Sequence, residues 1–249
     1  MRLEIAALST LPEVRPGDDL ALLISKAAAR EGQIIDRSVV LAVAQKIVSK
    51  AEGAIVDLRE IQPSALALSW AAEYSKDPRL IELILSQSRR VVKMDRGVLI
   101  TETPTGLVCA NAGVDQSNVD QSNVESDDFA TVLPNDPDAS ARLLRVSLGC
   151  GAVIITDTFG RPWREGLVDV AIGVSGLDPL DDLRGHVDRR GRKLAGTIVA
   201  RADQLAAAAG LLMPKAGGCP AVLIRGFEWK PAEASARLLL RKPEQDLFR

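Results

Sequence analysis

The segment VIITDTFGRPWREG, residues 153–166, carries the strongest structural signal in the chain. It opens with four β-branched residues in a row, which predict a buried strand. Asp157 and Thr158 follow where such a strand would emerge, and a turn at 160–162 would bring Arg161 and Arg164 back over the same end. A carboxylate beside a hydroxyl suits Mg²⁺ or Mn²⁺, and guanidinium groups suit phosphate. The segment therefore fits a metal-bound phosphate, and equally a core strand that runs into a polar turn.

The composition is that of an ordinary folded enzyme. The chain has 249 residues, of which 47% are hydrophobic and 26% charged, and it contains no linker, so we expect a single domain over 1–249. A net charge of −2 and few aromatic residues argue against a nucleic-acid or membrane partner. Cys109, Cys150 and Cys219 lack any paired spacing, and there is no export signal or apolar span. A reducing, cytoplasmic location is therefore expected.

Apolar periodicity predicts a mixed α/β fold. Strands are expected at 3–7, 39–44, 91–94, 98–102, 107–110, 153–156, 167–175 and 221–225, with a hairpin joining 98–102 to 107–110. Helices are expected from Asp18 or Asp19 to about 30, at 63–74, 77–88, 139–148 behind an Asp138 cap, and most clearly at 197–213. Residues 233–240 should add a short helix. Within 167–175, Val168, Val170, Ile172 and Val174 should share one face, and Asp169 should lie on a face of small residues.

Two further segments contain candidate phosphate or metal ligands. Lys46 and Lys50 follow the strand at 39–44, in a turn ending at 53, from which they could reach phosphate oxygens, although solvated surface lysines are the simpler interpretation. The loop NAGVDQSN at 111–118 is rich in oxygen and amide groups, as metal loops and ordinary turns both are. Its last five residues, VDQSN, are repeated at 119–123.

Only one copy of VDQSN can hold a given site. We favour Asp115 and Asn118, because they keep their spacing to the preceding strand, whereas Asp120 and Asn123 are displaced by five residues. The second copy is then a lengthened loop. No P-loop or dinucleotide fingerprint occurs, and the lone His186 makes a serine or cysteine triad improbable. The polar residues that remain fit metal-assisted phosphate chemistry.

Four separated blocks resemble the coenzyme F420-0:L-glutamate ligase family. They are QKIVSKAEG (45–53), NAGVDQSN (111–118), VIITDTFGRPWREG (153–166) and VDVAIGVSGL (168–177), and the segments at 11–20 and 211–226 are similar as well. The resemblance implies a two-lobed α/β ligase fold with mixed sheets, particular to the family, in an intertwined homodimer. Some members carry a further C-terminal flavin-binding domain, and this chain is similar to the free-standing form.

The resemblance also implies an activity. GTP and Mg²⁺ or Mn²⁺ would activate the terminal carboxylate of F420-0, the deazaflavin coenzyme precursor, as an acyl phosphate. The amino group of L-glutamate would then displace phosphate, and further γ-linked glutamates would extend the tail. No covalent enzyme intermediate is needed, so no residue is assigned a catalytic role of its own. The alternative is a metal- and nucleotide-binding paralogue that uses another acceptor or has lost ligation.

Residue by residue, the resemblance assigns metal binding to Asp115, Asp157 and Thr158. It assigns nucleotide binding to Thr10, Leu11, Pro12, Glu13, Gln45, Lys46, Lys50, Asn118, Met213, Pro214, Lys215, Ala216, Gly217 and Gly218. The VDQSN repeat is one departure from the family pattern. The other is that archaeal members follow the methionine with glycine and an acid that binds a second metal, whereas here Pro214 and Lys215 follow. A charged lysine cannot be a metal ligand, so either another group serves or Lys215 neutralises phosphate.

Overall fold

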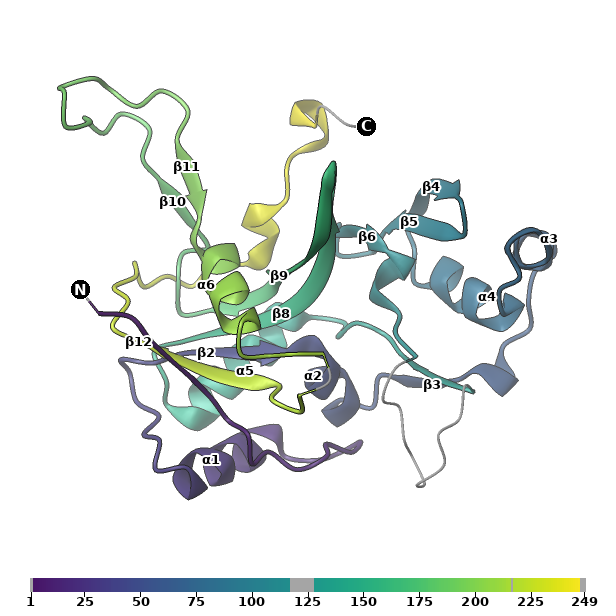
Figure 1. The fold of residues 1–249 in the computed structure, drawn as a ribbon, viewed down its shortest axis with the longest axis horizontal. Coiled ribbons are helices and arrows are strands. Elements are labelled where there is room, and N and C mark those ends of the chain that lie inside the picture. The colour runs from purple at the N-terminus through teal and green to yellow at the C-terminus, as the bar shows by residue number, and fades with distance from the viewer. Residues whose placement is uncertain (1, 117–127, 216, 247–249) are drawn as a thin grey trace.

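A computed structural model, which describes residues 2–116, 128–215 and 217–246, confirms the expected mixed α/β fold (Figure 1). Its centre is a five-stranded sheet in the order β1-β12-β2-β8-β9. The strands are β1 (Glu4–Ala7), β12 (Ala221–Arg225), β2 (Val40–Ala44), β8 (Ala152–Arg161) and β9 (Arg164–Ser175). The β2–β8 pair is parallel and the other neighbouring pairs of this sheet are antiparallel.

The central strands are buried on both faces, which explains their continuous apolar sequences. In β2, Leu41 and Val43 face a first core and Val40 and Ala42 face a second. Helices α1 (Leu20–Arg30) and α5 (Pro137–Leu148) contribute to the first core, and α6 (Arg201–Gly210) contributes to the second. The sheet is thus a middle layer between helices.

A second lobe has its own core. It contains α3 (Ala65–Tyr74), α4 (Pro78–Ser86) and the antiparallel sheet of β4 (Arg90–Asp95), β5 (Val98–Glu102) and β6 (Val108–Ala110), which confirms the expected hairpin. Strand β3 (Ile55–Asp57) pairs with β7 (Phe129–Thr131) beside it. The 3₁₀ turns are Leu58–Glu60, Asn111–Gly113, Ala236–Leu239 and Pro243–Gln245.

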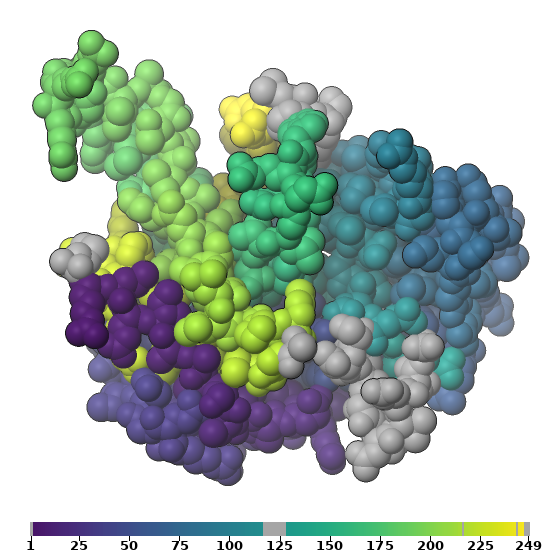
Figure 2. All heavy atoms as spheres, viewed as in Figure 1, coloured from purple at the N-terminus to yellow at the C-terminus, as the bar shows by residue number. Residues whose placement is uncertain are grey.

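Strands β10 (Leu180–Asp182) and β11 (Ile198–Ala200) form the base of an arm that projects from the large lobe, and Figure 2 shows the arm standing clear of the other elements on this face. No helix within the described ranges has both the length and the apolar character needed to cross a membrane.

The β8–β9 hairpin is longer than the sequence predicted. β9 pairs with β8 over its whole length, so Asp157 and Thr158 lie within the strand and not after it. Arg161 and Arg164 pair with each other at the tip, and Arg161 is four residues from Asp157, which is roughly 13 Å along a strand. The expectation that these arginines fold back over the carboxylate is therefore wrong.

A β-bulge also breaks the predicted alternation of β9. The register shifts between Ile155 and Thr156, leaving Ile172 as the extra residue opposite them. Ile172 faces the first core, whereas Val174 faces the second. The expected single apolar face from 168 to 174 is therefore wrong.

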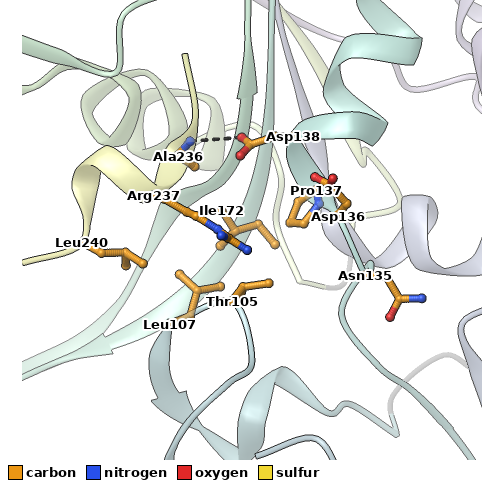
Figure 3. Close-up of a pocket in the computed structure, with 10 residues that line it drawn as sticks. All are labelled: Thr105, Leu107, Asn135, Asp136, Pro137, Asp138, Ile172, Ala236, Arg237 and Leu240. Atoms are coloured by element: carbon orange, nitrogen blue, oxygen red, sulfur yellow. Dashed lines mark hydrogen bonds between the residues drawn. The ribbon is translucent and has the colours of Figure 1, made fainter. Parts of the chain in front are cut away.

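Three local predictions differ from the structure. Residues 197–200 do not belong to the predicted helix at 197–213, since Ile198–Ala200 pairs with β10 and only Arg201–Gly210 is helical. The expected turn after β2 is instead helix α2 (Gln45–Ala51). Helix α5 is capped by Asp136. Asp138 instead accepts the N–H groups of Val174 and Ala236, which joins α5 to β9 and to the C-terminal segment beside a small pocket (Figure 3).

Close packing of α5 on β9 predicts a stability effect at Gly173. A Cβ at this position would overlap the carbonyl oxygen of Pro137. We therefore expect Gly173→Ala to lower the free energy of unfolding by ~1–3 kcal/mol in urea denaturation. Gly160→Ala in the same hairpin is the matched control, because nothing lies within 4 Å of a Cβ there. Equal losses in the two variants would contradict this explanation.

Candidate functional site

The carboxyl ends of the parallel strands β2 and β8 define the candidate site. β2 ends at Ala44, which pairs with Thr156, and the chain then turns into α2. β8 continues alone beside β9, so Asp157 is its first residue beyond the end of β2. The Ala44 N–H donates to the carbonyl of Pro220 at 2.8 Å, which fixes the loop after α6 against the same edge. Three chain segments meet there.

Asp115 reaches this edge from the second lobe. The backbone between β6 and Asp115 is left-handed at Asn111 and Ala112, with φ of 55° and 52°, a conformation that non-glycine residues adopt at a cost. Asp115 then forms two backbone hydrogen bonds with Thr131, of 3.0 and 2.8 Å. Its carboxylate lies 2.7 Å from the Lys46 ammonium on α2. The ion pair thus joins the second lobe to the end of β2.

The pKa of the Asp157 carboxyl group is strongly raised. Burial raises its pKa from 3.8 to about 6. A hydrogen bond from the Thr158 N–H and the charge of Lys215 lower this pKa, whereas the negative charges of Asp115 and Asp169 raise it. Three carboxylates and a lysine are therefore close enough to act on one another, as in sites that bind cations or move protons.

Thr158 is held by one acid and one lysine. Its hydroxyl donates to Asp169 Oδ1 at 2.5 Å, and the Lys215 ammonium donates to the same hydroxyl oxygen at 2.9 Å. Lys215 comes from the loop after α6, which also places Met213 Sδ 4.0 Å from Thr156 Oγ1. This loop therefore contacts β8 directly beside Asp157.

Neighbouring side chains on a strand point to opposite faces. The cross-strand partner of Asp157 is Val170, which packs on the first core, whereas the partner of Thr158 is Asp169. The site therefore has two parts. We call Lys46, Asp115 and Asp157 the carboxylate half, and Thr158, Asp169 and Lys215 the hydroxyl half.

Other residues predicted to bind nucleotide lie on α2 and on the loop at 10–13. Lys50 is buried and forms an ion pair with the exposed Glu13, which ties the loop at 10–13 to α2. Within that loop, the Thr10 N–H donates to Glu31, Leu11 packs on the first core, and Pro12 is exposed. Gln45 is buried and accepts the Ser49 hydroxyl at 2.9 Å.

Pro214, Lys215, Gly217 and Gly218 are exposed on the loop after α6. Asn118 and Ala216 lie outside the described residues, as do Asp120 and Asn123 of the repeat. The choice between the two VDQSN copies therefore stays a prediction, although Asp115 of the first copy does lie near Asp157.

The donor set fits a hard cation only if water or substrate completes its coordination. Among the described residues, no group of three His, Cys, Asp or Glu side chains is arranged to hold a metal ion. Asp115, Asp157 and the Thr158 hydroxyl supply oxygen atoms, which Mg²⁺ and Mn²⁺ prefer. Mg²⁺ usually keeps several waters and takes one or two carboxylates together with phosphate oxygens, so a sparse protein set is compatible with it.

Two residues beside the site carry no local signal that marks them in the sequence. The contact of Asp169 with Thr158 depends on the β8–β9 register, which its position among small residues does not reveal. Burial, with the nearby charge of Asp157, raises the pKa of the Cys109 thiol to about 12, which disfavours a thiolate there.

Comparisons with known proteins point to one family. Residues 9–226 match the family model described as F420-0:Gamma-glutamyl ligase. The coenzyme F420:L-glutamate ligase of Methanothermobacter thermautotrophicus is 46% identical over 257 residues, covering 100% of both chains. That of Methanopyrus kandleri is 47% identical, covering 95% of this chain and 94% of the relative. That of Methanocaldococcus jannaschii is 38% identical, covering 100% and 97%.

The raised pKa of Asp157 predicts how the stability of the metal-free protein depends on pH. The folded protein binds this proton more tightly than the unfolded chain does, so stability falls as pH rises from about 4 to about 6 and stays lower above that window. Asp157→Asn removes the charge and should raise the free energy of unfolding by ~1–3 kcal/mol at about pH 8, with little change below about pH 4. Urea denaturation in the presence of a chelator measures this. A variant less stable than wild type at the higher pH would contradict the assignment.

Proposed function

Because the chain belongs to the F420-0:gamma-glutamyl ligase family, we propose that it joins L-glutamate to the terminal carboxylate of coenzyme F420-0, using GTP and Mg²⁺ or Mn²⁺. The observation that supports the proposal best is the meeting of Asp115, Asp157 and Thr158 with Lys46 and Lys215 at one edge of the sheet. The homodimer and the cytoplasmic location implied by the family resemblance are part of the same proposal.

The acids and the hydroxyl are the groups that would hold cations. Asp115 and Asp157 would hold one cation from the carboxylate half, and Thr158 would hold a further cation from the hydroxyl half, because its side chain points to the opposite face of β8. A bound cation neutralises charge on the phosphate oxygens during transfer. The partly buried carboxylate of Asp157 would be stabilised in its charged form by the same cation, because burial alone favours its protonated form.

The lysines would hold the nucleotide. Lys46 is paired with Asp115 and Lys50 with Glu13, so each ammonium is held at the site edge by an acid. A triphosphate offers these ammonium groups stronger anionic partners, and Lys215 would add a third positive charge from the opposite side. Charge balance of this kind, together with alignment of the reacting groups, provides most of the catalysis in phosphoryl transfer.

The proposed reaction needs no nucleophile from the protein. A carboxylate oxygen of the acceptor attacks the γ-phosphorus, forming an O–P bond while the bond to the GDP oxygen breaks. The glutamate amine then attacks the acyl carbon, and phosphate leaves as the amide forms and the nitrogen loses a proton. The chain's task is to align the two anionic reactants and to exclude water from the acyl phosphate.

Incubation with GTP, Mn²⁺, L-glutamate and F420-0 tests the proposal. We expect a glutamate-dependent gain in the mass of the coenzyme and matching release of GDP. Asp157→Asn should abolish both while circular dichroism stays unchanged, because the variant keeps its shape but loses the charge that holds the cation. Release of GDP without any gain in mass would contradict the ligase, and normal turnover of Asp157→Asn would remove Asp157 from the site.

The VDQSN repeat supplies a matched pair of variants. Asp115→Asn should weaken Mn²⁺ and GTP binding at least tenfold, because losing even a group that only orients a metal ligand costs roughly 10–100-fold in affinity. Asp120→Asn should leave both affinities nearly unchanged, because it belongs to the displaced copy. Titration calorimetry of each variant gives these values. The reverse pattern would assign the site to the second copy.

A further inference from the structure

Asp169 is placed to control the direction of the Thr158 hydroxyl. The two residues are direct cross-strand partners in the β8–β9 hairpin, and Thr158 Oγ1 lies 2.5 Å from Asp169 Oδ1. This distance is at the short end for an O–H···O⁻ hydrogen bond, which is among the stronger kinds in proteins. Asp169 therefore determines where the hydroxyl proton lies.

The direction of each hydrogen bond follows from the groups involved. A threonine hydroxyl has one proton to donate, a carboxylate only accepts, and an ammonium only donates. When the Thr158 hydroxyl donates its proton in a hydrogen bond to Asp169, the lone pairs of the hydroxyl oxygen point away from that carboxylate. One of them accepts from Lys215 Nζ at 2.9 Å. The hydroxyl thus presents acceptors, and not a donor, on the side from which Lys215 approaches.

Asp169 is itself held in place by α6. Gly210 ends this helix, and a Cβ there would overlap Asp169 Oδ2. The absence of a side chain at 210 lets the end of α6 lie directly against the carboxylate, which restricts its movement. The hydroxyl half is therefore a packed arrangement and not a pair of free surface groups.

A role in stabilising the β8–β9 hairpin does not by itself explain why Asp169 bonds to Thr158. Nine residues of β8, from Val153 to Arg161, already pair with β9 through the backbone. Asp203 provides a contrast, because its carboxylate accepts the Ala171 N–H at 2.9 Å and so ties α6 to β9 without touching a proposed ligand. Asp169 is different in that its partner is the hydroxyl beside Asp157.

We propose that Asp169 is a positioning residue that orients the Thr158 hydroxyl, so that its oxygen can act as an acceptor toward a divalent cation. The inference rests on the proposed function, since it concerns how the chain's own residues prepare the cation site. A ligand oxygen needs a free lone pair, and a hydroxyl that donated toward the ligand could not supply one.

The test measures Mn²⁺ affinity of the purified full chain, by the electron paramagnetic resonance signal of free Mn²⁺, in the presence of GTP. Asp169→Ala should weaken binding by about tenfold or more, the usual cost of removing a group that orients a ligand. Asp169→Asn keeps an acceptor oxygen for the hydroxyl and should retain most of the affinity. Asp203→Ala is the control, with reduced stability in urea and unchanged Mn²⁺ affinity.

A double-mutant cycle with Thr158→Val shows whether Asp169 acts through the hydroxyl. If it does, adding Asp169→Ala to Thr158→Val causes no further loss of affinity. A further tenfold loss, or equal weakening by the asparagine and alanine variants, would overturn the inference and indicate that the charge of Asp169 acts directly. Wild-type affinity in Asp169→Ala would overturn it as well. If wild-type protein bound no Mn²⁺, the proposed cation function itself would fail.

Discussion

The parallel pairing of β2 with β8 is the constraint on which the rest of the site depends. Its register runs from Val40 opposite Ala152 to Ala44 opposite Thr156, so β2 stops one residue before Asp157. Parallel strands place their carboxyl ends together at one edge of a sheet. The start of α2 and the free part of β8 therefore meet at that edge, and β12 brings the loop with Lys215 to the other side of β2.

The carboxylates and lysines at this edge of the sheet affect the stability of the fold as well as the proposed function. Asp157 is partly buried near two other carboxylates, which favours its protonated form and weakens the fold when it ionises. The charge of Lys215 offsets part of that cost, and Lys46 pairs with the nearby Asp115. Under the proposed function, the acids of this edge would hold a cation and its lysines would hold phosphate.

Small residues on β9 and α6 make the arrangement possible. Gly173 lets α5 pack against the strand from one face, and Gly210 lets α6 reach Asp169 from the other. The bulge opposite Ile155 and Thr156 changes which side chains of β9 face each core, just before the strand reaches the site. Bulges often occur next to active sites, where they redirect side chains. The hairpin is thus both a structural support and the carrier of Asp157, Thr158 and Asp169.

The sequence by itself determined the fold class, most strands and helices, and the segments that contain the site. Local signals were sufficient where they matched the final environment, as in the doubly buried strand β2 and the helix that Asp19 caps. The family resemblance then selected Asp115, Asp157 and Lys46 as candidate binding residues, because their neighbours in the chain are distinctive. It could not show that Asp157 and Thr158 belong to opposite halves of the site, because that depends on the extent of β8–β9 pairing.

Only the tertiary structure decided the features that involve partners far apart in the chain. Residues 198–200 form a strand because β10 lies beside them, although their pattern suits a helix. Asp138 bonds to β9 and to the C-terminal segment and does not cap α5. Asp169 contacts Thr158 because of the β8–β9 register and because Gly210 leaves room for its carboxylate. The residues next to Asp169 in the chain indicate neither contact. The register of two strands depends on both strands and on the turn between them, so the periodicity of one segment does not by itself fix the hydrogen-bond partners across strands.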